Sequence, residues 1–312
     1  MNITFLGTSS GVPSLKRNVS SLALKLSQSS EVWLFDCGEG TQHQIMKSNI
    51  KSSQIKKIFI THMHGDHVYG LPGLLATLGL SGNSNGIEIY GPSELRGFIN
   101  SSLSTSYCKL SFPLHFVEVE NYALENKTLF ENNKIKVNCA CLKHKIPAYG
   151  YRVSEKDKLG IFDVKKAETL KISPGPIYSE LQKGKKVVLA DGRSFDGKDF
   201  CGPPRKGEVF VYCTDTVFSE SAVKLSKNAD LLVHESTFSE EDERMAYEKL
   251  HSTTIMAART ALLSNSKKLI ITHLSPRYTK KNAIKPSDLL KEAQTVFPNT
   301  HLAKDFLTTE IK

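Results

Sequence analysis

The chain has 312 residues, of which 39% are hydrophobic and 23% are charged, and its formal net charge at pH 7 is +9. This length can bury a sizeable core in one large domain or two small ones, and the globular composition excludes an intrinsically disordered chain. The positive charge favours an acidic partner, with nucleic acid as the first candidate and an anionic membrane surface as the second.

Secretion and membrane insertion are not expected from the sequence. The N-terminal stretch MNITFLGTSSG lacks the basic and apolar regions of a signal peptide, and no apolar run approaches the roughly 18 residues of a membrane span. None of the six cysteines forms a CxxC pair, so we expect reduced thiols. These features indicate a cytoplasmic protein with no membrane partner.

Strands and helices alternate along the chain in two halves. In the first half, apolar patterns predict strands over 2–6, 20–26, 31–36, 58–60, 87–91, 114–119 and 134–142, and helices over about 40–50 and 68–80. In the second half, they predict strands over 209–213, 230–234 and 268–272, and helices near 219–227, 239–249, 252–265 and 286–296. Two sheets covered by helices on both outer faces accommodate this order in a single α/β domain over 1–312.

Residues 155–207 interrupt this alternation. The segment from 156 to 206 holds 12 Lys or Arg and 7 Asp or Glu, so 51 residues carry +5 of the net charge. ProGlyPro, AspGlyArg and GlyProPro sequences predict turns within it. Because so long a connection is uncommon without a role, we expect an inserted, protruding basic arm. An ordinary solvated loop is the alternative.

The stretch 56–67, KKIFITHMHGDH, predicts a buried strand that leads into a metal-binding loop. Residues two apart in extended chain point the same way, so His62 and His64 can share one ion. The glycine before Asp66 permits a sharp turn, which can direct Asp66 and His67 toward a different point. Imidazole and carboxylate together suit zinc and similar divalent ions.

Three further candidate ligands each follow an apolar strand. His144 follows KIKVNCACLK, Asp215 follows VFVYCT, and His273 follows KLIIT. A single histidine after a strand is more often a structural residue than a ligand. Three such residues, in the order His, Asp, His, instead indicate ligands that gather at the strand ends on one edge of a sandwich.

The complete order HxHxDH, His, Asp, His resembles the metallo-β-lactamase superfamily. This resemblance implies an αββα four-layer sandwich and two Zn²⁺ ions per subunit, with Mn²⁺ or another divalent ion as the alternative. It implies one ion held by His62, His64 and His144, a second held by Asp66, His67 and His273, and Asp215 bridging the two. Paired ions of this kind activate water at neutral pH, and Asp66 would orient that water or accept its proton.

Features beyond the metal ligands resemble the short-form ribonuclease Z (tRNase Z) family, which trims the 3′ trailer from precursor tRNA. The opening FLGTSSGVP with 13–18 resembles a PxKxRN loop motif, 234–238 (HESTF) resembles a HEAT-type motif, 251–253 resembles an HST motif, and 155–207 resembles a flexible tRNA-binding arm. The family implies a homodimer with precursor tRNA as substrate. It also implies that His251, positioned by Glu235, donates a proton to the leaving 3′-oxygen; a purely structural pair is the alternative.

Contacts with RNA are expected at basic and aromatic side chains. Lysines of the inserted segment can contact phosphates away from the cleavage site. Just after His273, Arg277 can hold a phosphate and Tyr278 can stack a base. For that pair, a surface arginine and a packing tyrosine are the alternative. The predicted substrate-binding residues are Arg17, Lys183, Lys185, Lys186, Arg277 and Tyr278.

Other hypotheses share part of this pattern. Another hydrolase of the same superfamily, acting on a small phosphodiester, thioester or lactone, would share every metal ligand but would not need the basic insertion or Glu235 and His251. The exonuclease-type ribonuclease branch carries a larger inserted domain than this chain can hold. A non-catalytic tRNA-binding or zinc-storage protein is disfavoured because all seven ligands are present.

Overall fold

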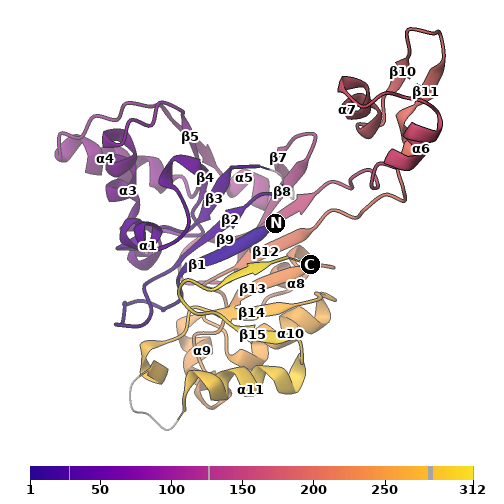
Figure 1. Cartoon of the computed structure of the whole chain (residues 1–312). Coiled ribbons are helices and arrows are strands. Elements are labelled where there is room, and N and C mark those ends of the chain that lie inside the picture. The colour runs from indigo at the N-terminus through magenta and orange to yellow at the C-terminus, as the bar shows by residue number, and fades with distance from the viewer. Residues whose placement is uncertain (28, 126, 280–283, 312) are drawn as a thin grey trace. The chain divides into compact units, whose positions relative to one another are not determined.

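The computed structural model describes residues 1–27, 29–125, 127–279 and 284–311. Its strands form two seven-stranded sheets and a separate two-stranded one (Figure 1). The first sheet contains, in spatial order, β16 (Thr308–Glu310), β1 (Asn2–Gly7), β2 (Ser21–Lys25), β3 (Val32–Phe35), β4 (Ile55–Phe59), β5 (Ile87–Gly91) and β6 (Leu114–Glu118). The second contains β15 (Thr300–Leu302), β14 (Leu269–Thr272), β13 (Leu231–Glu235), β12 (Val209–Cys213), β9 (Ala148–Glu155), β8 (Ile135–Leu142) and β7 (Thr128–Glu131).

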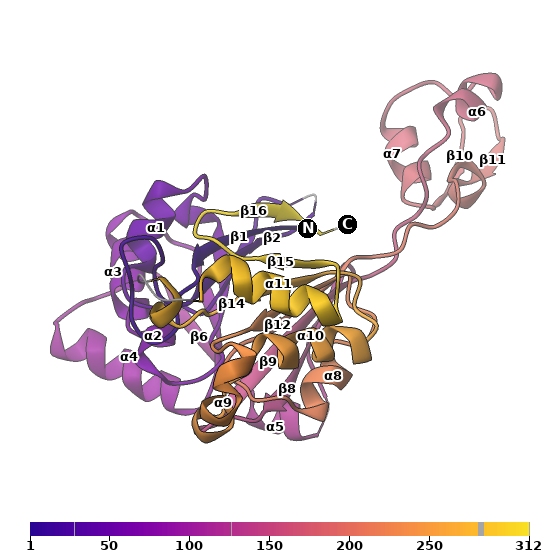
Figure 2. The same cartoon turned by 90° about the horizontal axis from the view of Figure 1, so that it is seen from below.

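Helices cover the outer faces of both sheets (Figures 1 and 2). The first half of the chain contributes α1 (Thr41–Lys47), α2 (Gly65–Val68), α3 (Leu71–Leu80), α4 (Glu94–Thr105) and α5 (Glu120–Leu124). The second half contributes α8 (Glu220–Leu225), α9 (Glu243–Lys249), α10 (Thr254–Leu263) and α11 (Pro286–Val296). Short 3₁₀ turns are η1 (Ser52–Gln54), η3 (Glu240–Asp242) and η4 (Pro276–Thr279). Within the described ranges, no helix combines the length and apolar character that crossing a membrane requires.

Aromatic side chains fill the space between the two sheets. The ring of Phe35 in β3 lies 4.9 Å from that of Phe59 in β4, and on the opposite sheet it lies 5.5 Å from Phe210 and 6.1 Å from Tyr151. All four rings are buried, and burying a side chain of this size contributes about 1.5–3 kcal/mol. This arrangement of helices, two sheets and helices confirms the predicted four-layer sandwich.

Parallel strands bring distant parts of the chain to one edge. β3 to β6 pair in parallel in the first sheet, and β12 to β15 pair in parallel in the second. Such pairs need crossover connections, which the helices supply. The carboxyl ends of these strands therefore lie together, and the segments after Phe59, Cys213 and Thr272 carry the predicted ligands.

Several elements differ from the predicted ones. The helix expected over 68–80 begins only at Leu71, as α3, because Pro72 suits the first turn of a helix but not its interior. The separate short helix α2 ends at Val68 and was not predicted. The helix α4 was not predicted, since Ser, Thr, Asn and Gly make up half of its sequence ELRGFINSSLST. The strand β9 was also not predicted.

Residues 133–135 and 154–208 form a compact unit of their own, here called the basic unit. It contains α6 (Val164–Thr169), α7 (Pro176–Gln182), η2 (Gly197–Phe200) and a hairpin of β10 (Lys186–Val188) with β11 (Ser194–Asp196). Its core is formed by Ala167, Ile172, Leu181 and Phe200. The sequence predicted turns in this region but neither the helices nor a core, and a tRNA-binding role for the unit stays a prediction.

Candidate active site

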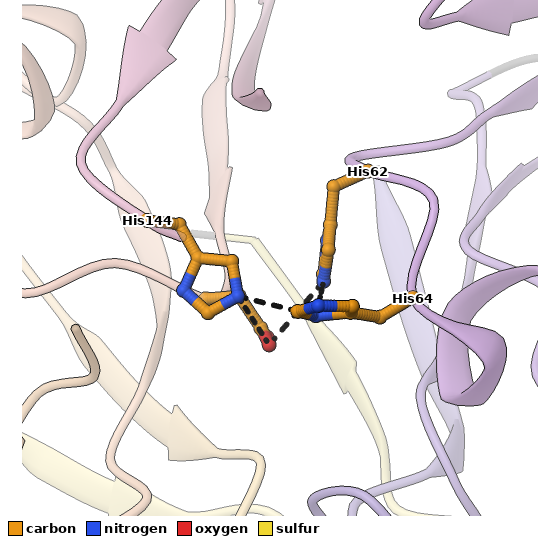
Figure 3. A group of neighbouring side chains, drawn as sticks. His62, His64 and His144 are labelled. Atoms are coloured by element: carbon orange, nitrogen blue, oxygen red, sulfur yellow. Dashed lines mark hydrogen bonds and ion pairs between the residues drawn. The ribbon is translucent and has the colours of Figure 1, made fainter. Parts of the chain in front are cut away.

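Three histidines form the first group of candidate ligands. His62 and His64 lie in the loop after β4, and the Nε2 atom of His62 is 3.0 Å from Nδ1 of His64. His144 follows β8, and its Nε2 atom is 3.2 Å from the same nitrogen of His64. Figure 3 shows the three rings facing one another. The structure thus brings together the three histidines that were expected to share one ion.

Asp66, His67 and His273 form the second group. Asp66 and His67 lie in α2, and His273 directly follows β14. The Oδ2 atom of Asp66 is 3.4 Å from Nε2 of His67 and 3.4 Å from Nε2 of His273. The turn at Gly65 therefore directs Asp66 and His67 to a second point, as predicted, and His273 faces the same point from the end of β14.

Asp215 lies between the two groups. Its Oδ2 atom is 3.4 Å from Nε2 of His62, in the first group. Its Oδ1 atom is 3.3 Å from Nε2 of His67 and 3.3 Å from Nε2 of His273, in the second group. Each carboxylate oxygen thus faces a different group, which is the geometry that a bridging ligand requires.

The two groups fit divalent cations. Zinc–nitrogen bonds of about 2.0–2.1 Å at tetrahedral angles place ligand atoms roughly 3.3 Å apart, and the neighbouring atoms above are separated by 3.0–3.4 Å. The Nε2 atom of His67 and the Oδ1 atom of Asp215 are buried without a hydrogen-bond partner among the described residues. Buried polar atoms in this state need a ligand or water. These residues could therefore hold a metal ion.

Protonation of the first group suits metal binding. Burial lowers the pKa of His62, and burial lowers the pKa of His144 to about 4 although Asp215 opposes the shift. Both rings are therefore neutral at pH 7, and a ring nitrogen must be free of its proton to bind a metal.

The second group concentrates charge. Burial raises the pKa of Asp66, but His67 and His273 outweigh it, so the pKa lies well below its usual range. Burial lowers the pKa of His67, but Asp215, Asp66 and Asp36 outweigh it and raise the pKa well above its usual range. This position attracts positive charge, and a divalent cation would compete with the proton there.

Asp36 orients His67. The Nδ1 atom of His67 donates a hydrogen bond of 2.8 Å to Oδ2 of Asp36, which leaves Nε2 facing the second group. The backbone N–H of Thr61 donates to Oδ1 of Asp36 at 2.8 Å, and the Tyr212 hydroxyl lies 3.3 Å from Oδ2. Sequence reasoning assigned no role to Asp36. Its position at the end of the strand EVWLFD is the same strand-end signal that identified the histidines and could have found it.

Three residues of the site have left-handed backbone conformations. The φ angles of Asp36, Asp215 and His273 are 57°, 51° and 58°. This region is uncommon for residues other than glycine, although Asp and His enter it more readily than most. The surrounding hydrogen bonds hold these residues there, and each conformation turns the chain sharply at a strand end.

Glu235 and His251 form a buried pair next to both groups. The Nδ1 atom of His251 donates to Oε1 of Glu235 at 2.8 Å and lies 3.9 Å from Oδ2 of Asp215. Glu235 also accepts from the Thr216 N–H at 2.9 Å and from the Thr237 hydroxyl at 2.7 Å. Burial lowers the pKa of His251, but Glu235 and Asp215 outweigh it and raise the pKa to about 9. His251 is therefore a cation at neutral pH and can donate a proton.

Thr237 connects this pair with the second group. Its hydroxyl oxygen lies 3.0 Å from Nδ1 of His273 and 2.7 Å from Oε2 of Glu235. By accepting the proton on Nδ1, the hydroxyl leaves Nε2 of His273 available to a metal. Sequence reasoning named the motif around Thr237 but gave this threonine no role.

Two predicted substrate-binding residues are buried, and a substrate contact for either stays a prediction. The side chain of Arg17 is 7% exposed, and its Nη1 atom donates to the Thr8 hydroxyl and to the Ala303 carbonyl, both at 2.7 Å. Tyr278 is 3% exposed, and its hydroxyl donates to Asp242 at 2.5 Å, as expected for a packing tyrosine. Burial and intramolecular hydrogen bonds hold both side chains in this conformation.

The other predicted substrate contacts lie at the surface. Arg277 is partly exposed, and its guanidinium lies 5.0 Å above the ring of Phe238 and 3.3 Å from Asp242. In the basic unit, Lys183 and Lys185 both form ion pairs with Glu180, while more than half of each lysine side chain is exposed. Lys186 lies in β10. A role for these residues in binding RNA stays a prediction.

Two metal-binding groups at one edge of a two-sheet sandwich define a metallo-β-lactamase fold protein. The metallo-β-lactamase fold protein YhfI from Bacillus subtilis aligns with a TM-score of 0.68 and 17% identity, over 99% of this chain and 98% of that chain. Residues 1–160, which include five of the seven candidate ligands, match the family model described as Anti-Pycsar protein Apyc1.

Closer relatives identify the family. Ribonuclease Z of Prochlorococcus marinus strain MIT 9301 is 90% identical over 312 residues, and the match covers 100% of both chains. The crystal structure of human tRNase Z, short form, is 32% identical, with a TM-score of 0.71 and coverage of 100% of both chains. The chain belongs to the ribonuclease Z family, which confirms the predicted resemblance.

Proposed function

We propose that this chain is an endoribonuclease that removes the 3′ trailer of precursor tRNA, leaving a 3′-hydroxyl on the tRNA and a 5′-phosphate on the trailer. Relatives named ribonuclease Z and tRNase Z support this proposal. The observation that carries it is the position of His251. Its Nδ1 atom donates a hydrogen bond to Glu235 and lies 3.9 Å from Asp215, the residue between the two groups. Hydrolysis of thioesters or lactones needs no such cationic donor beside the metal ligands.

Two divalent cations would be held in this site, with zinc as the first choice and manganese as the alternative. The first group would supply His62, His64 and His144, the second group would supply Asp66, His67 and His273, and Asp215 would serve both. Such ions lower the pKa of bound water to about 7 and offset the negative charge of a phosphodiester.

Asp66 orients the attacking water. Its carboxylate is ionised, and its Oδ2 atom faces His67 and His273. Because the pKa of Asp66 lies well below its usual range, this carboxylate is a weak base, and orientation is a larger part of its role than proton transfer. The water oxygen forms a bond to phosphorus, and the bond between phosphorus and the 3′-oxygen breaks.

His251 protonates the leaving group. The imidazolium transfers its proton to the departing 3′-oxygen, which becomes the 3′-hydroxyl of the tRNA. Glu235 stabilises the charged ring and fixes its orientation, since its carboxylate accepts the Nδ1 proton and leaves the other ring nitrogen to donate. Glu235 is fully buried, so this interaction is not weakened by solvent.

The basic unit is proposed to bind tRNA away from the cleavage site. Its exposed lysines would contact phosphates, which position the RNA without reading its sequence. Replacing Lys183, Lys185 and Lys186 with alanine should weaken tRNA binding and flatten its dependence on salt, by about one unit of the log–log slope for each phosphate that is no longer bound. Lys224→Ala is the control, because Lys224 also pairs with a glutamate of its own helix but lies outside the basic unit. An unchanged salt slope would exclude the role.

The proposal also includes a homodimer in the cytoplasm, in which the basic unit of one copy holds tRNA for the active site of the other. The resemblance to the short-form family supports this arrangement. Light scattering should give twice the mass of the 34.6 kDa chain. A monomer that is fully active on precursor tRNA would rule the arrangement out.

The direct test uses metal-loaded protein and a precursor tRNA with a 3′ extension. We expect a mature tRNA with a 3′-hydroxyl and a trailer with a 5′-phosphate, both defined by mapping the product ends. Asp66→Ala should abolish cleavage while retaining most RNA binding. If the tRNA stays intact while a thioester or a small phosphodiester turns over rapidly, the chain is a different hydrolase of the same fold.

A further inference from the structure

The loop of residues 8–18, here called the N-terminal loop, contacts the second group of ligands from outside it. The backbone N–H of Gly11 donates a hydrogen bond of 2.8 Å to Oδ2 of Asp66. Leu274, which directly follows His273, donates to the Thr8 carbonyl at 3.0 Å and accepts from the Ser10 N–H at 3.1 Å. One loop therefore contacts both Asp66 and the backbone that carries His273.

A single carboxylate holds the two ends of this loop together. The Oδ1 atom of Asp305 accepts from the Thr8 hydroxyl at 2.6 Å, and Oδ2 accepts from the Asn18 N–H at 2.7 Å. The side chain of Gln44 in α1 donates to the same Oδ2 atom at 3.0 Å. The Thr8 hydroxyl also accepts a hydrogen bond from Arg17, so it acts both as donor and as acceptor. We call these five residues the Asp305 clamp.

The clamp lies where the chain passes between the two sheets. Asp305 belongs to the connection from β15 in the second sheet to β16 in the first. Asp66 follows a strand of the first sheet, whereas His273 follows a strand of the second. The distance between Asp66 and His273 therefore depends on the relative position of the two sheets at this edge. The Asp305 clamp lies at the same edge, in the connection between the sheets.

The first group is supported differently. The Nδ1 atom of His144 donates to the Leu250 carbonyl at 2.9 Å, and Nδ1 of His62 lies 3.0 Å from the Thr61 hydroxyl. Neither partner belongs to the N-terminal loop or to the Asp305 clamp. Disturbing the clamp should therefore affect one group of ligands and spare the other.

We propose that Asp305 is a positioning residue for the second metal group. Through the Thr8 hydroxyl and the N-terminal loop, it fixes the Asp66 carboxylate and the backbone at His273 at the separation that one cation requires. This inference rests on the proposed metal-dependent function and adds to it a residue far from the ligands in sequence. Arg17, which was predicted to bind substrate, is part of the clamp.

The test measures zinc affinity in four variants. Thr8→Val removes the hydroxyl but keeps the shape of the side chain, and Thr8→Ser restores the hydroxyl. Asp305→Ala removes the carboxylate. Asp230→Asn is the control, since Asp230 also accepts a backbone N–H, that of Val209 at 2.8 Å, but lies outside the clamp. Zinc binding is followed by competition with a chelator, and the ligand environment by the absorption spectrum of Co²⁺-loaded protein.

We expect the weaker of two zinc affinities to fall about tenfold in Thr8→Val and about 10- to 100-fold in Asp305→Ala, as for other residues that orient metal ligands. The stronger affinity should stay unchanged, Thr8→Ser should bind like the parent protein, and so should Asp230→Asn. On precursor tRNA, kcat should fall with little change in KM and recover at high zinc concentration.

Two results for zinc binding would overturn the inference. If Thr8→Val binds two zinc ions with parental affinities and the parental cobalt spectrum, the clamp is only structural and the inference is overturned, even if Asp305→Ala fails to fold. Equal weakening of both zinc sites would also overturn it. Parental protein that binds zinc as expected but leaves precursor tRNA intact would instead reject the proposed function.

Discussion

The two groups of candidate ligands differ in the residues that stand behind them. In the first group, neutral partners hold the imidazoles: the Thr61 hydroxyl lies beside His62, and the Leu250 carbonyl accepts from His144. In the second group, the carboxylate of Asp36 stands behind His67, and Asp66 is itself a ligand candidate. Imidazole alone suits zinc, whereas carboxylate oxygens also suit manganese. The two groups are therefore not equivalent, and manganese would be accommodated first in the second.

The largest effect on metal content is expected from Asp215→Ala, because Asp215 is the residue that the two groups share. The change removes a negative charge and one oxygen from each group. Bound metal contributes several kcal/mol to the stabilisation of the transition state, so cleavage of precursor tRNA should fall at least about 10³-fold. Metal analysis should show loss from both groups. Full loading with both ions would contradict a shared ligand.

His251→Asn tests whether the Glu235 pair belongs to the chemistry or to the metal groups. Loss of a general acid should lower kcat about 10²- to 10³-fold. Metal content should not change, because the proton-bearing nitrogen of His251 faces Glu235. The rate of the parent protein should decline as pH rises through the pKa of His251, which Glu235 raises against the opposing effect of burial, and this decline should vanish in the variant. A variant that loses metal instead would assign His251 to the ligands.

Asp36→Asn should separate the two groups. The amide retains the size of the carboxylate, but it removes the charge behind His67 and weakens the hydrogen bond that orients that ring. The metal affinity of the second group should fall about 10- to 100-fold. The affinity of the three-histidine group should fall less, because Asp36 reaches His62 only through the Thr61 hydroxyl. Isothermal titration with zinc and then with manganese measures both. Equal loss in both groups would show that the asymmetry described above has no consequence for binding.

The smallest effect concerns pH and stability in the metal-free protein. The pKa of folded His251 is raised to about 9 from an ordinary value of 6.5. A raised histidine pKa contributes stability that is complete below pH 6.5 and is lost as pH rises through 9. The thermal midpoint should therefore fall between these values, and the difference between the parent protein and His251→Asn should shrink across the same range. A difference that does not change with pH would show that Glu235 does not stabilise a charged ring.

Local spacing was enough to predict the ligands. His62 and His64 are two positions apart after a strand, and a glycine separates them from Asp66 and His67, so geometry within six residues determined the division into two groups. His144, Asp215 and His273 were found because each directly follows an apolar strand, and strand ends of this kind gather at one edge of a sandwich. The sandwich itself followed from the alternation of apolar strands and amphipathic helices.

Burial and long-range partners could not be predicted in the same way. Arg17 looks like a phosphate-binding residue until its partners Thr8 and Ala303 are known, and the latter is 286 positions away. The role of Asp305 could not be predicted from the sequence, because it depends on three hydrogen-bond donors from other parts of the fold. The core of the basic unit was hidden for a different reason: its helices are short, and Gly and Pro surround them.

The left-handed backbone at Asp36, Asp215 and His273 has a consequence for evolution and engineering. Each such residue costs on the order of 1 kcal/mol or more relative to a relaxed conformation, and glycine would relieve that cost. Selection for thermostability alone would therefore favour glycine at Asp215 and His273, where the side chain serves the metal groups, but not at Asp36, whose carboxylate accepts buried hydrogen bonds from Thr61 and His67. A library screened only for heat resistance should accumulate inactive variants there, because catalysis in this fold is maintained against its own stability.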